Sequence, residues 1–219
     1  VYIEKVRSSG EFPPVLPQFR LDEAQWYPPL FPWLMARAPA MLLDRHANLL
    51  AVVIDLTRLM LLIAAVYMLS GTLEAMLVAG LVYAATPVLI TYNMQLNPRG
   101  LGALFLDGAL LALAAALWRD GGVMAWGLAM FCGGLVLLTH KMTTQLMIFV
   151  VLVATLVLHD ARLLLLPVGA VFVAMLLSAG LYARVARAHK DILLFWFHNW
   201  RWSGSNPILE SPIYGDPGY

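Results

Sequence analysis

Residues 49–69 read LLAVVIDLTRLMLLIAAVYML, and this stretch decides the fold class. It is as long as the roughly 20 mostly apolar residues that a helix needs to cross a bilayer. Its only charged residues are Asp55 and Arg58. They are three positions apart, so on a helix they share a face and can neutralise each other. The stretch therefore predicts a membrane-spanning helix with a structural ion pair.

Five similar stretches follow, and the six expected spans are residues 49–69, 73–92, 101–118, 123–139, 143–158 and 162–182. The fourth and fifth are short and are separated only by His140, Lys141 and Met142. We expect a tight turn at the membrane surface there, with Thr143 as a candidate cap for the next helix. One long helix would place two polar groups in mid-bilayer, which is costly. Asp107 lies inside the third span and is a candidate functional carboxylate whose partner the sequence does not identify.

The composition agrees with a polytopic membrane protein. Hydrophobic residues make up 61% of the 219 and charged residues 12%, whereas soluble domains have about 45–50% and about 25%. A net charge of +1 gives no indication of a nucleic-acid partner, and the single Cys132 excludes an intrachain disulfide. The spacing of His, Cys, Asp and Glu suggests no metal site, so no divalent metal is indicated. We expect an all-α fold: a polytopic transmembrane helical bundle with juxtamembrane helices.

Residues 1–48 are expected to form an extramembrane loop that contains a juxtamembrane helix. Residues 26–39 read WYPPLFPWLMARAP. Consecutive prolines lack backbone donors and are disfavoured within a span, but proline is tolerated in the first turn of a helix. We therefore expect Pro28 and Pro29 to start a short helix whose aromatic and leucine side chains enter the headgroup layer, where Trp and Tyr are enriched.

Residues 183–219 are expected to form an interfacial loop, because this segment is both aromatic and basic. It contains ARVARAHKDILLFWFHNWRW (183–202). The irregular, polar start and the loop-like end of the sequence also lead us to expect an internal piece of a longer protein. The domain plan is thus an extramembrane segment (1–48), a six-helix transmembrane region (49–182) and this interfacial loop.

Positive charge is concentrated on one side of the membrane. Alternating the six spans places residues 1–48, 93–100, 140–142 and everything after 182 on that side, with nearly all loop Lys and Arg. The positive-inside rule would make this side cytoplasmic. A site for an anionic lipid would explain the same charges, but charge counting alone favours the cytoplasmic assignment.

Two turns on the basic side carry candidate anion-binding residues. Arg99 follows Asn97 and Pro98 at the start of the third span, where it is either a snorkelling arginine or a phosphate ligand. His140 and Lys141 stand in a turn rich in hydrogen-bond donors. Each turn alone is explained as an interfacial helix start, but a shared side makes one lipid-phosphate site from Arg99, His140 and Lys141 a reasonable hypothesis.

Asp22 and Glu23 precede the proline-rich helix and are the candidate catalytic carboxylates. A carboxylate at the membrane surface can activate a hydroxyl or amine acceptor. An acidic pair that precedes a helix and interacts favourably with its dipole explains the same residues equally well.

Three stretches together resemble the GT-C superfamily of membrane glycosyltransferases, which includes protein mannosyltransferase-like and aminoarabinose transferase-like enzymes. YIEKVRSSGEFP followed by DEAQWYPPLFPWLMA resembles the external loop with its proline-aromatic entry. PVLITYNMQLNPRGLGALF and LLTHKMTTQ resemble two later turns on the active side. The resemblance implies a fragment that lacks the first helix and the usual catalytic carboxylate, and is therefore inactive alone. It also puts the basic side outside the cytoplasm.

The resemblance implies transfer of a sugar from a polyprenyl-phosphate carrier to an acceptor at the non-cytoplasmic face of the bacterial inner (cytoplasmic) membrane. Arg99, His140 and Lys141 would hold the phosphate, while Asp22 or Glu23 would orient the acceptor. The partners would be membrane lipid and the lipid-linked sugar donor, and no other cofactor is indicated. Because the assignment as an enzyme is open, we retain an alternative: a non-catalytic polytopic subunit that scaffolds a larger membrane complex.

Overall fold

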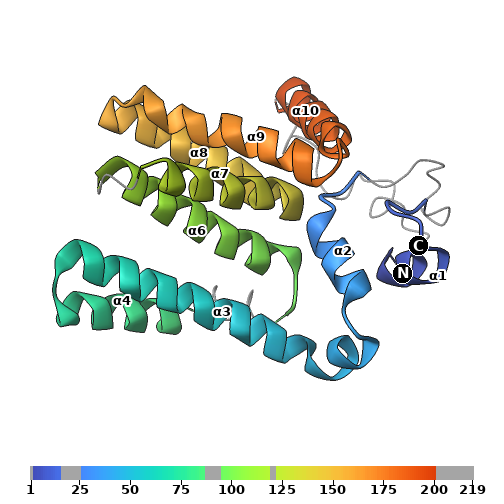
Figure 1. Ribbon diagram of the computed structural model, residues 1–219, viewed down its shortest axis with the longest axis horizontal. Coiled ribbons are helices and arrows are strands. Elements are labelled where there is room, and N and C mark those ends of the chain that lie inside the picture. Colours follow the sequence, from blue (N-terminus) through green and yellow to red (C-terminus); the bar gives the residue numbers. More distant parts are fainter. Residues whose placement is uncertain (1, 16–25, 87–94, 119–121, 201–219) are drawn as a thin grey trace, which may run out of the picture. The chain divides into compact units, whose positions relative to one another are not determined.

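The computed structural model describes residues 2–15, 26–86, 95–118 and 122–200. Every regular element in these ranges is a helix, which confirms the all-α class (Figure 1). Four of the helices are long and apolar enough to cross a membrane, and they identify an integral membrane protein. They are α3 (Ala40–Ser70), α6 (Pro98–Trp118), α7 (Gly122–Thr139) and α8 (Lys141–Leu158).

The first expected span lies within α3, which is longer than predicted and contains a kink. His46 has non-helical dihedral angles (φ −128°, ψ 15°), so the straight part of the helix begins close to the predicted start. α3 ends before Gly71, whose φ of 69° is left-handed and favours glycine. The next helix, α4 (Leu73–Ala85), is apolar but shorter than a full span. The remainder of the second expected span, from residue 87, lies outside the described residues.

The later helices pack around α7. α6 and α9 (Leu165–Leu177) make the most extensive contacts with it, and α8 leads into α9 through the short 3₁₀ helix η2 (Ala161–Leu164) (Figure 1). The sixth expected span corresponds to η2 and α9 and is also shorter than the four long helices. Because three residues join α6 to α7 and one joins α7 to α8, α6 and α8 run parallel and begin at the same face.

Small residues permit the close contact of α7 with α9. A Cβ atom added to Gly134 would lie 2.8 Å from Cβ of Val173 and 3.2 Å from the carbonyl oxygen of Ala170. One added to Gly133 would lie 3.0 Å from Cβ of Ala170. Membrane helices associate through such small-residue faces because lipid supplies no hydrophobic force that would press them together.

The predicted juxtamembrane helix is α2 (Leu30–Arg37), and its start directly after Pro28 and Pro29 is confirmed. Phe31 and Pro32 are buried, and α2 contacts α7. The guanidinium carbon of Arg37 lies 3.9 Å from the centre of the Trp33 ring, a cation–π contact on the exposed side.

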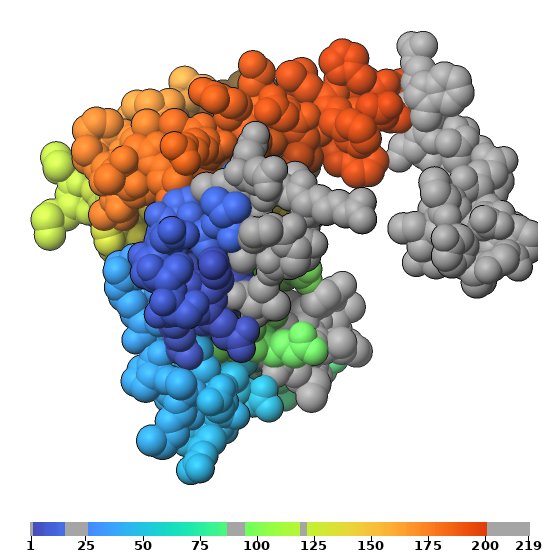
Figure 2. Space-filling view, turned by 90° about the vertical axis from the view of Figure 1, so that its right-hand side faces the viewer, coloured from blue at the N-terminus to red at the C-terminus, as the bar shows by residue number. Residues whose placement is uncertain are grey.

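A second short helix, α1 (Tyr2–Ser9), packs against α2, and the two form adjoining blue surfaces in Figure 2. Arg7 of α1 donates to the carbonyl oxygens of Met35, Ala36 and Ala38 at 3.0, 3.1 and 2.6 Å. The last carbonyls of a helix have no partner within it, so Arg7 supplies donors to the end of α2.

The residues after Tyr182 belong to a second unit of the chain, of which the structure describes residues 183–200. The segment expected as an interfacial loop is helical in its first half, as α10 (Tyr182–Asn199). No glycine or proline interrupts this stretch, so the backbone can continue as a helix. The aromatic side chains of Phe195, Trp196 and Phe197 are exposed, as an interfacial segment requires.

Candidate functional site

Arg99 stands in the first turn of α6, where the sequence placed it. Asn97 caps the helix, since its Oδ1 accepts a hydrogen bond from the backbone N–H of Gly100 at 3.0 Å. Pro98 is the first residue of the helix, a position at which its missing N–H has no cost. Arg99 is exposed at this end of the helix.

His140 is the single residue between α7 and α8, which confirms the tight turn. Its backbone is extended (φ −152°, ψ 127°), and it is the N-cap of α8. Nδ1 accepts from the backbone N–H of Thr143 at 3.4 Å and lies 3.1 Å from the Thr143 hydroxyl. His140 therefore caps α8, and the expectation of a Thr143 cap was wrong. A histidine that accepts at Nδ1 carries its proton on Nε2 and presents that N–H as a donor.

Gly102 brings the start of α6 against the start of α8. A Cβ atom at Gly102 would lie 3.1 Å from Oγ1 of Thr143 and 3.2 Å from Cβ of His140, so a side chain would crowd this contact. Arg99 is three residues earlier and shares that helix face. The approach of the two helices thus places Arg99 beside the turn that carries His140 and Lys141.

The pKa of His140 also indicates that Arg99 and Lys141 lie near its side chain. The pKa of His140 is lowered from 6.5 to about 4. Burial is the largest cause, and the positive charges of Arg99 and Lys141 contribute to the same shift. His140 is consequently neutral at physiological pH, and the positive charge of the site comes from Arg99 and Lys141. These two cations stand at the N-termini of two parallel helices, whose dipoles and free N–H groups also favour an anion.

Tyr27 joins this group, although the sequence gave no reason to single it out. Burial raises the pKa of Tyr27, and the nearby positive charge of Arg99 opposes the rise. Tyr27 precedes the two prolines that start α2, so the proline-aromatic segment begins near Arg99. We call Tyr27, Arg99, His140 and Lys141 the cationic cluster.

An apolar groove lies next to the cationic cluster. It has a volume of about 490 Å³, and residues of α2, α7 and the end of α9 line it, among them Pro29, Leu30, Trp33, Leu135, Leu138 and Leu181. Two short stretches of chain connect it to the cluster. Pro29 is two residues from Tyr27, and Leu138 is two residues from His140. The groove and the cationic cluster are therefore close to each other along two segments of the chain.

Asp22 and Glu23, the candidate catalytic carboxylates, lie outside the described residues. No group of three His, Cys, Asp or Glu side chains that could hold a metal ion occurs in the described ranges.

A second polar group lies inside the transmembrane helices. Nε of Arg58 in α3 donates to Oδ2 of Asp107 in α6 at 2.8 Å, which identifies the partner that the sequence left open for Asp107. The Tyr83 hydroxyl of α4 donates to Oδ1 of Asp55 at 2.6 Å. These contacts join the α3–α4 hairpin to α6, so the charges of the first span also serve tertiary contacts.

Comparison with known proteins adds no further assignment: no family model, curated protein or solved structure matches this sequence.

Proposed function

We propose that this protein binds a polyprenyl-phosphate-linked sugar and takes part in transfer of the sugar to an acceptor at the outer face of the bacterial inner membrane. One observation supports the proposal: two cations and a neutral histidine lie near one another at the start of two parallel helices, and an apolar groove begins two residues away along the chain. A ligand that suits both features has an anionic head and a long apolar tail.

Each part of the surface has a distinct role in this proposal. Arg99 and Lys141 hold the phosphate, and the guanidinium of Arg99 contributes planar, paired donors. His140 donates from Nε2 without adding charge. As the sugar leaves, negative charge grows on the phosphate, and fixed donors at that point stabilise the transition state. The groove at α2 holds the first isoprene units, while Asp22 or Glu23 orients the acceptor.

The test is binding of undecaprenyl phosphate to the full chain in nanodiscs, measured by native mass spectrometry. We expect Arg99→Ala and Lys141→Ala each to weaken binding about tenfold or more, since hydrogen bonds to charged groups contribute about 1.5–3 kcal/mol. The matched control is Arg162→Ala, which removes an exposed arginine that follows α8, beyond the opposite end of that helix. Equal binding by all three variants would overturn the proposed site.

Competing lipids separate this ligand from other anionic lipids. Phosphatidic acid has a similar head group but two acyl chains, so it should displace undecaprenyl phosphate poorly if the groove selects an isoprenoid. Release of undecaprenyl phosphate from its sugar-linked form, measured with a radiolabelled sugar, then tests the transfer step itself.

One observation favours the alternative of a scaffold subunit in a larger membrane complex. In the most apolar 18-residue window of α3, only 6% of the residues are buried. Because so few residues of α3 pack against the rest of the chain, most of its apolar surface is available to contact other membrane helices. The scaffold hypothesis expects stable co-purification with other membrane proteins together with no effect of Arg99→Ala on lipid binding.

A further inference from the structure

The Arg58–Asp107 pair has unused hydrogen-bonding capacity inside the membrane region. A guanidinium has five N–H donors, and among the described residues Arg58 uses only Nε, toward Oδ2 of Asp107. Oδ1 of Asp107 has no hydrogen-bond partner within the same ranges. The two side chains are only 15% and 32% exposed. Polar groups left unsatisfied at membrane depth cost several kcal/mol each, so a ligand that hydrogen-bonds to these groups would be stabilised here.

A cavity of about 310 Å³ lies against this pair. Arg58, Asp107 and Tyr83 form its polar end, and its remaining walls are apolar: Leu61, Leu62, Ala65, Leu110 and Leu111. Leu62 is 37% exposed, so the cavity reaches the apolar outer surface of the helices. Its volume is at the lower end of the range of small-molecule sites, about 300–1,000 Å³, and such sites share this pattern of apolar walls with a few polar groups.

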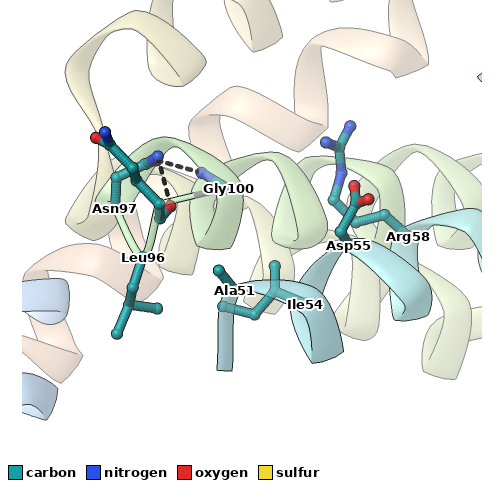
Figure 3. Close-up of a pocket in the computed structure, with 8 residues that line it drawn as sticks. Ala51, Ile54, Asp55, Arg58, Leu96, Asn97 and Gly100 are labelled. Atoms are coloured by element: carbon teal, nitrogen blue, oxygen red, sulfur yellow. Dashed lines mark hydrogen bonds between the residues drawn. The ribbon is translucent and has the colours of Figure 1, made fainter. Parts of the chain in front are cut away.

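The other side of Arg58 has no room for such a ligand. A second cavity there, shown in Figure 3, is lined by Asp55, Arg58 and Asn97 with their neighbours and has a volume of only about 10 Å³. That is space for about one water molecule. Figure 3 shows the side chains of Asp55 and Arg58 extending from the same helix beside this small cavity. A ligand larger than water must therefore enter from the side of Asp107.

We propose that the larger cavity binds a neutral amphiphile, an apolar chain that ends in a hydroxyl group. The hydroxyl oxygen accepts from the terminal N–H groups of Arg58, and its O–H donates to Oδ1 of Asp107. The chain lies along the leucine walls. A carboxylate end would be repelled by Asp107, and an ammonium end by Arg58. Water alone would meet five apolar side chains and could not complete its hydrogen bonds.

The test uses the full chain in detergent micelles and a decanol that carries a photoreactive diazirine in its alkyl chain. Mass spectrometry locates the cross-links. We expect them in peptides that contain residues 61–65 and 110–111, and at least fivefold fewer when excess 1-decanol is present. Excess decane or decanoate should leave the cross-links unchanged, because neither presents a neutral hydroxyl.

Two variants test the polar end and the cavity separately. Arg58→Met with Asp107→Leu removes both charges of the ion pair together, so neither partner of the pair is left uncompensated, and decanol should then compete no better than decane. Ala65→Phe fills the cavity and should reduce cross-linking at least fivefold. Ala64→Phe is the matched control, because Ala64 is the exposed neighbour on the same helix and does not line the cavity.

Three outcomes would overturn this proposal: no cross-links in the expected peptides, equal competition by decane and decanol, or equal cross-linking in the Ala65→Phe and Ala64→Phe variants. None of these outcomes bears on the cationic cluster, because no residue of that cluster lines the cavity.

Discussion

Nε of Arg58 lies 2.8 Å from Oδ2 of Asp107, so an ion pair between residues 49 positions apart connects α3 to α6. Asp107→Asn would leave Arg58 charged and uncompensated in a largely apolar surrounding. Breaking a fully buried pair costs about 3–5 kcal/mol, and the partial exposure of Asp107 reduces this. We expect a loss of about 1–3 kcal/mol in the free energy of unfolding, measured by denaturation with SDS in mixed micelles.

The control for this prediction is a second Asp–Arg pair, which is local in sequence and does not connect two helices of the bundle. Asp160 accepts from Arg162 at 2.7 Å, and Asp160→Asn should have little effect because the pair joins residues two positions apart, the arginine is 67% exposed, and asparagine can still cap the short helix η2. The double variant Arg58→Met, Asp107→Leu should lose less stability than Asp107→Asn alone. If Asp107→Asn and Asp160→Asn have equal effects, the pair between α3 and α6 does not stabilise the bundle.

His140 should make stability depend on pH in an acidic window. Its pKa in the folded protein is about 4, below the ordinary 6.5. The unfolded chain therefore binds the proton first, and stability falls as the pH decreases from about 6.5 to about 4. Above that window this group contributes no pH dependence. We expect a loss of about 1–3 kcal/mol across the window, measured as the free energy of unfolding at each pH.

His140→Asn isolates this effect from the other histidines. Asparagine is a good N-cap but does not titrate, so the variant should keep the start of α8 and lose only the pH dependence. The measured quantity is the difference between wild type and variant, in which contributions from groups outside this site cancel. A difference that stays constant from pH 7 to pH 4.5 would contradict a buried, neutral His140.

Two glycines of α7 should respond in opposite directions to alanine. A Cβ at Gly134 would lie 2.8 Å from Cβ of Val173, so Gly134→Ala must push α7 and α9 apart. Overpacking of this kind costs about 1–3 kcal/mol. No atom lies within 4 Å of a Cβ at Gly127, and Gly127→Ala should be neutral or stabilising by up to about 1 kcal/mol. Both effects are measured as the free energy of unfolding, and equal values would mean that α9 does not pack on Gly134.

Arg7 should control local opening of α1 and leave global stability nearly unchanged. Arg7→Ala removes three hydrogen bonds to the last carbonyls of α2. Because the contact is exposed, we expect a cost of about 1 kcal/mol, or roughly fivefold faster hydrogen exchange in residues 2–9. Exchange in α7 should not change. Lys5→Ala is the control, since Lys5 is exposed on the same helix, and equal exchange in both variants would show that Arg7 does not hold α1.

Much of the fold could be predicted from the sequence, because local chemistry determines it. Long apolar runs identified the spanning helices, and consecutive prolines identified the start of α2. Asn97 and Pro98 fixed the start of α6. The extent of α4 and α9 was harder to predict, since apolar composition does not say where a helix ends. The helix over 182–199 was missed because aromatic and basic composition suggested an interface and not a backbone conformation.

The candidate site was predictable only in part. Membrane sidedness suggested that Arg99 and the His140–Lys141 turn share a face, and the structure places Arg99 near that turn. The missing side chain at Gly102, which permits this approach, had no signal in the sequence. The same holds for Tyr27 and for the Arg58–Asp107 pair, because each depends on contacts between helices. Whether these residues bind a lipid phosphate stays a prediction.

The single-residue joint at His140 has a mechanical consequence. One residue cannot absorb a change in chain length, so inserting or deleting a residue there would rotate all of α8 by about 100° about its own axis. Substitutions at this joint are therefore tolerable where changes of length are not. The joint also couples the two helices closely, because only three positions separate Leu138, at the end of α7, from Lys141, at the start of α8.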